Sequence, residues 1–371
     1  MKANRGELLA ALRTAAVGAA RPPRAPTHEQ SDCFCFTKDE VVCFNDEIAT
    51  RTPTPLPGIE GACAADDLLR VLEKLPDAEV EIERRGAELQ IRGERKSAGI
   101  VLQAQVLLPF DGVPKPGKWE KLRPHTADLL KQAARTCGRD LSNPLTTVVH
   151  ATPDKIEACD NFRLFRAKAR TGISERILIP AAALAEIEDV PIHRASVRKG
   201  WMHFRTTKKP GGACISIRCL SDDYVDLDKA LAIKDARAVA LPENLAKMLE
   251  RSEAMHEGAD PLVRISVEAG RLAIRAEKET GWYREQKKCA YRGEPIRFRV
   301  NPDFLADVLR LTTNVQIGDG KMRIESDGIE FVVALEAPED KAEGAPAEGK
   351  KPKAEKAKKA KKAKKKVAVE A

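Results

Sequence analysis

The stretch RGEPIRFRVNPDFLADVLRL, residues Arg292–Leu311, joins a strand directly to a helix. Every second residue of Ile296–Val300 is apolar, which is typical of a half-buried strand. Asn301 can then cap a helix, and Pro302 takes the first helical position, where its missing N–H leaves no hydrogen bond unmade. Apolar side chains follow at helical spacing. The stretch therefore predicts a strand that runs into a capped helix.

The same strand–helix unit recurs along the chain. Six helix-like segments align on their first core leucine, and successive leucines lie roughly 55–61 residues apart. Two alternating stretches separated by Gly, Asp or Pro follow each segment and predict a β-hairpin. The expected helices are Gly6–Ala16, Asp66–Leu75, Thr126–Cys137, Ala181–Glu188, Pro242–Met255 and Pro302–Leu311.

One such module is too small to bury its own sheet face, so the repeat predicts that modules pair. The result is an α+β fold of three tandem domains, each built from two helix-plus-antiparallel-strand modules. After the last module the alternation stops, and a Lys/Ala-rich basic tail without core-forming residues is predicted to be disordered. The predicted division is residues 1–116, 117–235 and 236–336 for the domains and 337–371 for the tail.

Composition and charge bound the class of protein. The chain has 371 residues, of which 43% are hydrophobic and 32% charged, as suits a globular protein of two or three domains. It has no apolar run long enough to cross a membrane, and its nine scattered cysteines favour reduced thiols in the cytoplasm. The tail carries 12 lysines and 6 acidic residues, so most of the net charge of +8 lies there and the body is nearly neutral.

The chain has no recognisable catalytic or cofactor site. It lacks a GxxxxGK[ST] loop, and GDGKM at Gly318–Met322 reads as a hairpin turn, so we expect no ATP hydrolysis. Cys33, Cys35, Cys43 and His28 lack a C-x-x-C spacing, and core residues explain the cysteines better than a metal site does. The carboxylates form no recognisable catalytic pair. We expect no enzymatic activity, metal or cofactor; the alternative is an unrelated enzyme with a cysteine nucleophile.

Four motifs carry a resemblance to a known family. They are YRGEPIRFRVNPDFLADVL at Tyr291–Leu309, FNDEIATRT at Phe44–Thr52, EACDNFRLFR at Glu157–Arg166 and FVVAL at Phe331–Leu335. They resemble segments of the bacterial-type DNA polymerase sliding clamp, the beta subunit of the replicative polymerase. The first motif resembles a segment of that family's third domain, the second one of its first domain, and the third one of its second domain. The fourth motif resembles the family's closing strand. The resemblance covers roughly residues 5–336.

The resemblance implies the DNA clamp fold and its function. Two three-domain subunits of this family close head-to-tail into a ring around duplex DNA, and the homodimer tethers the DNA polymerase and confers processivity. A separate ATP-dependent clamp loader opens the ring, and no membrane is involved. A closed ring also leaves no sheet edge open. The alternative is a clamp-fold interaction scaffold that does not close a ring, which the weakly apolar first strand favours.

The charges on the helices give an independent indication of DNA contact. Basic residues recur two and six places after the core leucines, on a helix face away from those leucines. This recurrence favours sequence-independent contacts to phosphates, although ordinary solvent-facing helix residues are basic as well. The tail lysines either add to this affinity or form a solubilising or regulatory appendage. The candidate DNA-binding residues are Arg13, Arg24, Arg70, Lys74, Lys131, Arg135, Lys247, Arg251 and Arg310.

The resemblance also implies a partner groove. Polymerases and other clients of the family insert a short peptide into an apolar groove between the second and third domains, which requires exposed apolar anchors. The Gly-His of the family's second-domain motif reads Asn161-Phe162 here, and several of the apolar candidates are equally explained as core residues. The candidate groove residues are Leu145, Asn161, Phe162, Arg163, Leu164, Phe304, Val332, Ala334 and Leu335.

Overall fold

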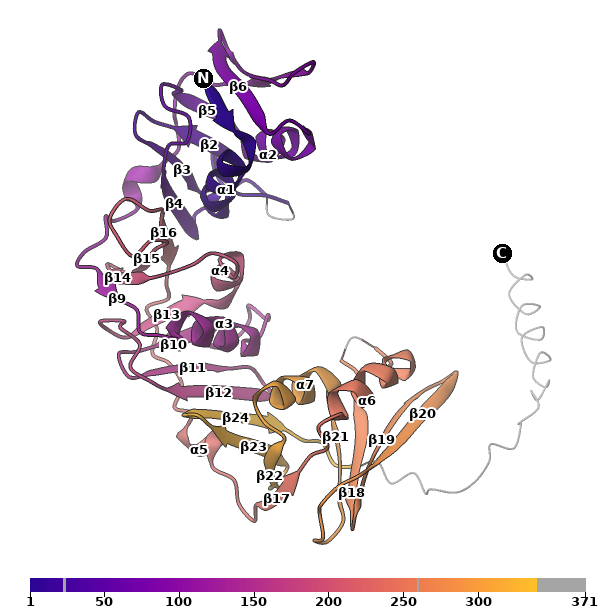
Figure 1. Ribbon diagram of the computed structural model, residues 1–371. Helices are drawn as coiled ribbons and strands as arrows, with labels where there is room; N and C mark the ends of the chain where they lie inside the picture. The colour runs from indigo at the N-terminus through magenta and orange to yellow at the C-terminus, as the bar shows by residue number, and fades with distance from the viewer. Residues whose placement is uncertain (23–24, 259, 339–371) are drawn as a thin grey trace, which may run out of the picture. The chain divides into compact units, whose positions relative to one another are not determined.

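The computed structural model describes residues 1–22, 25–258 and 260–338. All the described helices and strands lie within Met1–Ala337, which forms one unit (Figure 1). Of the predicted tail, only the first two residues fall among the described ones.

Each of the six modules consists of one strand, one helix and three further strands. The first strands are β1 (Lys2–Asn4), β5 (Gly61–Ala64), β9 (Glu120–Lys121), β13 (Ile177–Pro180), β17 (Arg237–Ala240) and β21 (Ile296–Val300). The helices are α1 (Arg5–Ala15), α2 (Ala65–Lys74), α3 (Thr126–Thr136), α4 (Ala181–Glu186), α6 (Leu245–Ser252) and α7 (Pro302–Leu311).

The three strands after each helix form an antiparallel meander. In the first three modules they are β2 (Cys33–Phe36), β3 (Glu40–Phe44), β4 (Ile48–Pro53), β6 (Glu79–Arg85), β7 (Glu88–Arg92), β8 (Ser97–Val101), β10 (Val148–Ala151), β11 (Lys155–Cys159) and β12 (Arg163–Lys168). In the last three they are β14 (Arg194–Arg198), β15 (Trp201–Arg205), β16 (Cys214–Arg218), β18 (Val263–Glu268), β19 (Arg271–Lys278), β20 (Gly281–Lys288), β22 (Asn314–Gly318), β23 (Lys321–Ser326) and β24 (Ile329–Ala334). A short helix, α5 (Asp228–Leu231), precedes the fifth module, and 3-10 turns occur at Ala16–Gly18, Phe110–Gly112, Pro144–Thr146 and Glu253–Met255.

The local sequence signals predict the ends of most helices to within a few residues of their observed bounds. Helix α7 has the predicted bounds, and the Asn301 side chain caps it by accepting a hydrogen bond from the Asp303 N–H at 2.9 Å. The prediction of a helix over Pro242–Met255 was too long, because the α-helix begins at Leu245. The Leu245 N–H donates to the Pro242 carbonyl at 2.9 Å, so a tight turn occupies the place of the first helical turn.

Two hairpins of the last module turn on Asp-Gly pairs. Asp319 and Gly320 have φ angles of 48° and 66°, and Asp327 and Gly328 have φ angles of 50° and 78°. Positive φ at both central residues is the geometry of the type I′ turn, which matches the twist of the two flanking strands. The segment GDGKM is therefore a hairpin turn, as predicted.

Neighbouring modules exchange their first strands. Strand β5 of the second module pairs with β2 of the first, and β1 of the first pairs with β6 of the second. The same exchange recurs in the other two pairs of modules. Two modules thereby share their sheets, while the domain boundaries given above stay a prediction.

Two eight-stranded sheets continue from one pair of modules into the next. Their strand orders are β5-β2-β3-β4-β16-β15-β14-β9 and β13-β10-β11-β12-β24-β23-β22-β17. The joints are thus β4–β16 and β12–β24, and each joins the last strands of two modules. The two other last strands, β8 and β20, are edge strands of four-stranded sheets and pair on one side only within the described part of the chain.

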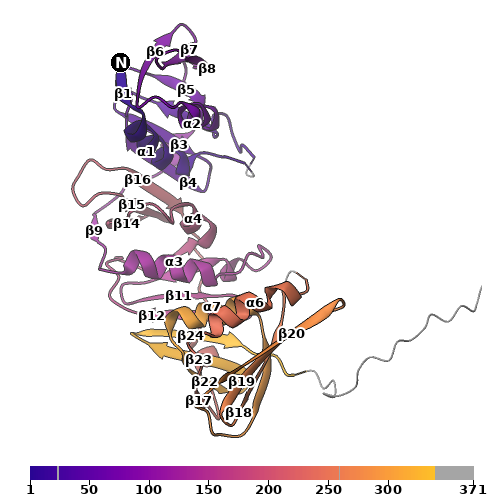
Figure 2. The same cartoon turned by 45° about the vertical axis from the view of Figure 1, so that its right-hand side comes forward.

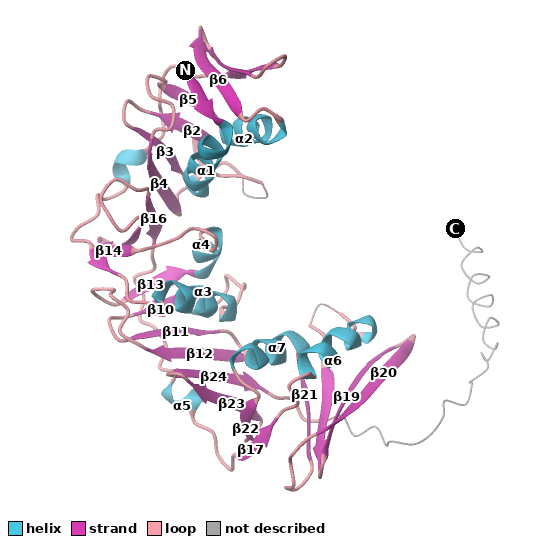
Figure 3. Ribbon diagram, in the orientation of Figure 1, coloured by secondary structure: helices cyan, strands magenta, loops and turns pink. Residues whose placement is uncertain are grey.

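The helices of the modules lie on one side of the eight-stranded sheets (Figure 2), whereas α5 lies on the other (Figure 3). Helix α3 packs against β10, β11 and β12, and α7 packs against β24. Across the β12–β24 joint, the buried rings of Phe165 and Phe331 pack edge to face, with centroids 6.4 Å apart. Such an aromatic pair contributes about 0.5–1.5 kcal/mol beyond its buried area. The core therefore runs unbroken through this joint.

Candidate partner groove and basic helix faces

Two of the predicted groove residues, Phe162 and Phe304, lie side by side near the place where β12 meets β24. Phe162, in the turn before β12, is 55% exposed, and its ring lies beside that of Phe304 on α7, with centroids 6.2 Å apart and planes 31° apart. The Ala334 N–H donates a hydrogen bond of 2.7 Å to the Phe162 carbonyl, which ties this turn to β24. An exposed aromatic side chain on a rigid support is a typical anchor point for a peptide.

The Arg163 guanidinium packs against one ring of this aromatic pair, that of Phe304. Its guanidinium carbon lies 4.2 Å from the centroid of the Phe304 ring. The guanidinium also forms ion pairs of 2.9 Å with Asp160 and with Asp307 of α7, and the Arg163 side chain is only 11% exposed. Burial raises the pKa of Asp307, although Arg163 and Arg310 act to lower it. Arg163 thus links the turn before β12 to helix α7 and restrains the Phe304 ring.

The other predicted groove residues differ in exposure. Leu164 and Val332 lie opposite each other across the joint and are 5% and 6% exposed. Leu227, which precedes α5, and Leu231, its last residue, pack against Leu164 and Val332. Leu164 and Val332 therefore belong to a small covered core. Of the remaining candidates, Asn161 and Ala334 are exposed, and Leu145 and Leu335 are half-buried.

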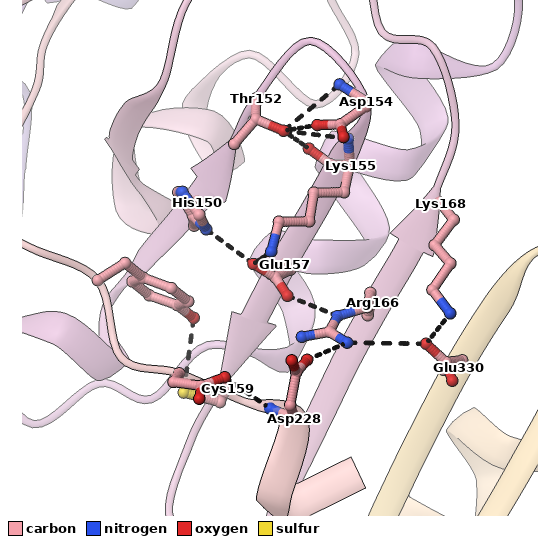
Figure 4. A network of polar contacts seen from close by, with 12 residues as sticks. His150, Thr152, Asp154, Lys155, Glu157, Cys159, Arg166, Lys168, Asp228 and Glu330 are labelled. Carbon is pink, nitrogen blue, oxygen red and sulfur yellow. Dashed lines mark hydrogen bonds and ion pairs between the residues drawn. The ribbon is translucent and has the colours of Figure 1, made fainter.

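A buried ladder of polar side chains crosses the same joint (Figure 4). The Glu157 carboxylate on β11 is 2% exposed and lies 2.8 Å from His150 Nδ1 on β10. It also accepts a hydrogen bond of 2.5 Å from Arg166 Nε on β12. Arg166 continues the ladder to Asp228 of α5 at 2.7 Å and to Glu330 of β24 at 4.0 Å. The ladder therefore connects three strands of one module to a strand of the last module and to α5.

The ionisation of Glu157 depends on these partners. Burial by itself would raise the pKa of Glu157, but hydrogen bonds from His150, Lys155 and Arg166 outweigh it and lower the pKa to about 2. A buried carboxylate with such partners stays charged at neutral pH, and removing a partner leaves an uncompensated charge. This ladder was not predicted from the sequence, because a polar residue in a single strand is expected to face solvent. The available signal was one charged or polar residue per strand at matching register.

The predicted basic residues lie on the helices, but the arginines have acidic partners. Lys74 and Lys247 are exposed and Lys131 is half-buried, and no ion pair within 4.0 Å joins these lysines to a carboxylate of the described residues. Arg24 lies outside the described residues. The arginine pairs are Arg13–Glu73 at 2.9 Å, Arg70–Asp66 at 2.6 Å, Arg251–Glu285 at 2.7 Å, Arg310–Asp307 at 2.8 Å, and Arg135–Glu188.

Seven of the nine cysteines are buried, and Cys214 and Cys219 are half-buried. Cys33 and Cys35 pack in one hydrophobic cluster, whereas Cys43 and Cys63 pack in another. Burial raises the pKa of the Cys35 and Cys63 thiols to about 12. No group of three or more His, Cys, Asp or Glu that could hold a metal ion occurs among the residues that the structure describes. Within the same residues, no helix is long and apolar enough to cross a membrane.

No protein-family model matches the sequence, and no curated protein matches it significantly. Solved structures do match the fold. The DNA polymerase III beta subunit from Thermotoga maritima matches with a TM-score of 0.74 at 15% sequence identity. The match covers 91% of this chain and 99% of the Thermotoga chain. The DNA polymerase sliding clamp from Bacillus subtilis has a TM-score of 0.72 at 16% identity, and the match covers 91% of this chain and 98% of the Bacillus chain. The beta subunit from the DNA polymerase of Streptococcus pyogenes has a TM-score of 0.71 at 14% identity, and the match covers 90% of this chain and 98% of the Streptococcus chain. The chain therefore has the fold of the bacterial DNA polymerase sliding clamps.

Proposed function

We propose that this protein is a sliding clamp, which encircles duplex DNA as a head-to-tail homodimer and tethers a replicative DNA polymerase to confer processivity. The observation that carries this proposal is the pairing of the last strands of the modules. Four of them form the joints β4–β16 and β12–β24, and the remaining two, β8 and β20, are edge strands.

The two edge strands expose apolar side chains. Val101 at the end of β8 is 68% exposed, and Trp282 near the start of β20 is 62% exposed. Exposed apolar residues on an unpaired edge are a liability unless a partner covers them. If β8 of one subunit pairs with β20 of a second copy, two four-stranded sheets become one eight-stranded sheet, as at the two joints inside the chain.

The geometry of this contact favours a closed dimer. Strands β8 and β20 are different surfaces, so the contact is head-to-tail, and two such contacts between two copies close a ring. The helices lie on the side of the sheets that carries the basic residues, which suits sequence-independent contact with phosphates. The ring would be opened by a separate ATP-dependent clamp loader.

The groove beside Phe162 provides the proposed contact with the polymerase. Its exposed ring, backed by Phe304 and restrained by Arg163, offers an apolar anchor for a client peptide.

The oligomeric state tests the proposal. We expect the protein to have twice the mass of its 40.7 kDa chain in light scattering, and Trp282→Glu to be a folded monomer. Leu141→Glu is the matched control, because Leu141 is 80% exposed but lies away from both edge strands. A monomeric wild type, or a Trp282→Glu variant that stays dimeric, would contradict ring closure through these strands and would favour the interaction scaffold.

A further inference from the structure

Three of the arginines on the helices pair with glutamates of neighbouring elements. Arg13 at the end of α1 pairs with Glu73 of α2, at 2.9 Å. Arg135 at the end of α3 pairs with Glu188, which follows α4. In the last pair of modules, Arg251 at the end of α6 donates three hydrogen bonds, of 2.7, 2.8 and 3.0 Å, to Glu285 of β20. The last turn of the first helix in each pair of modules thus carries an arginine that pairs with a glutamate.

The lysines on these helices are arranged differently. Lys74 on α2, Lys131 on α3 and Lys247 on α6 have no carboxylate of the described residues within ion-pair distance. Each predicted domain contributes one of these lysines. Their ammonium groups therefore add net positive charge to the helix side of the sheets, whereas each arginine–glutamate pair adds none.

We propose that Lys74, Lys131 and Lys247 bind the DNA phosphates, while Arg13, Arg135 and Arg251, each paired with a glutamate of a neighbouring element, add no net attraction. The proposal rests on the proposed clamp function and names the groups that make its DNA contact.

Charge and geometry both support this division. A phosphate that takes an arginine from its glutamate leaves the carboxylate unpaired beside a second anion, so the exchange brings no net electrostatic gain. A lysine carries a compact charge on a flexible side chain, whereas an arginine binds phosphate through directional, bidentate hydrogen bonds. Contacts through lysine can pass from one phosphate to the next, which suits a protein that moves along DNA.

The test separates net charge from residue type. Full-length variants are titrated against a fluorescent 40-base-pair duplex of mixed sequence over a series of salt concentrations, with anisotropy as the readout. The first variant is Lys74→Gln, Lys131→Gln and Lys247→Gln together. We expect the slope of log K against log salt to fall by about 0.9 for each lysine that contacts a phosphate.

The second variant removes two complete pairs that lie off both edge strands, Arg13→Gln with Glu73→Gln and Arg135→Gln with Glu188→Gln, and leaves the net charge unchanged. We expect its affinity and salt slope to match the wild type within twofold. Exposed ion pairs add little to stability, so the variant should also fold, which its melting temperature checks.

A third variant controls for net charge. Lys199, Lys208 and Lys209 are exposed in the loops of the β14–β15–β16 meander, away from the helices, and their replacement by Gln removes the same charge as the first variant. We expect it to bind like the wild type. The proposal is overturned if loss of the arginine pairs weakens binding as much as loss of the helix lysines, or if the helix lysines and the loop lysines prove equivalent. Wild-type protein that fails to stay on circular DNA after loading would instead contradict the clamp function.

Discussion

Replacing Glu157 by glutamine tests whether the buried polar ladder stabilises the joint between β12 and β24. Glutamine keeps the shape of the side chain but removes the charge that His150, Lys155 and Arg166 surround. The pKa of Glu157 falls from 4.5 to about 2, which corresponds to roughly 3 kcal/mol of stability at about 1.4 kcal/mol per pKa unit. We therefore expect Glu157→Gln to lower the free energy of unfolding by about 3 kcal/mol at pH 7.

The sign of the pH dependence follows from the lowered pKa. The contribution of Glu157 is fully present above its unfolded pKa of 4.5 and is lost as the pH falls through about 2. Other carboxylates titrate in the same range, so the difference between wild type and variant isolates Glu157. That difference should be largest at pH 7 and shrink steadily toward pH 2.

Urea unfolding followed by circular dichroism gives the global value, and amide hydrogen exchange on β12 and β24 gives the local one. Glu325→Gln is the control, because this carboxylate of β23 is 65% exposed and pairs with Arg323 near the end of the same ladder. We expect the control to change stability by less than about 0.5 kcal/mol. A Glu157→Gln variant as stable as the control, or a difference that does not depend on pH, would refute the reasoning.

Two further predictions concern the groove and the thiols. Phe162→Ala should weaken the binding of a peptide from the cognate polymerase by about 30-fold or more in calorimetry, since truncating a central aromatic anchor costs about 2 kcal/mol. Leu107→Ala, at an exposed leucine in the loop after β8, should leave the affinity unchanged. Equal affinities for the two variants would place the client elsewhere. Because burial raises the pKa of Cys35 and Cys63 to about 12, native protein at pH 8 should resist iodoacetamide at both sites and unfolded protein should not. Rapid labelling of either native thiol, seen by peptide mass spectrometry, would contradict their burial.

The modules could be predicted from the sequence because their signals are local. The cap at Asn301 and the proline after it fix the start of α7 within one turn of chain, and the Asp-Gly pairs fix two hairpins. At Pro242 the same kind of signal failed, because a hydrogen-bonded turn competed with the first turn of the helix.

The contacts between modules could not be predicted in this way. The β12–β24 joint pairs Leu164 with Val332, and the sequence gives no local sign of which strand edges meet. Helix α5, which covers this pair, has only four residues and no period to detect. Phe162 was identified through a family motif, whereas its support by Phe304 and Arg163 depends on the joint.

The same limit applies to the charges. Counting along each helix placed the basic residues on one face, but the partner of Arg13 lies 60 residues away on another helix. Which cations are already neutralised therefore depends on how helices pack, and helical spacing alone treats Arg13 and Lys74 as equivalent.

Retention on DNA tests most directly whether the protein closes a ring. The protein is loaded by a cognate clamp loader and ATP onto nicked circular plasmid or onto the same plasmid linearised, and both are washed at high salt. Retention on the circle with loss from the linear ends is the result we predict, because a closed ring is linked to DNA by topology and screening of charge does not release it. Equal loss from both would show binding by charge alone and would contradict the sliding clamp.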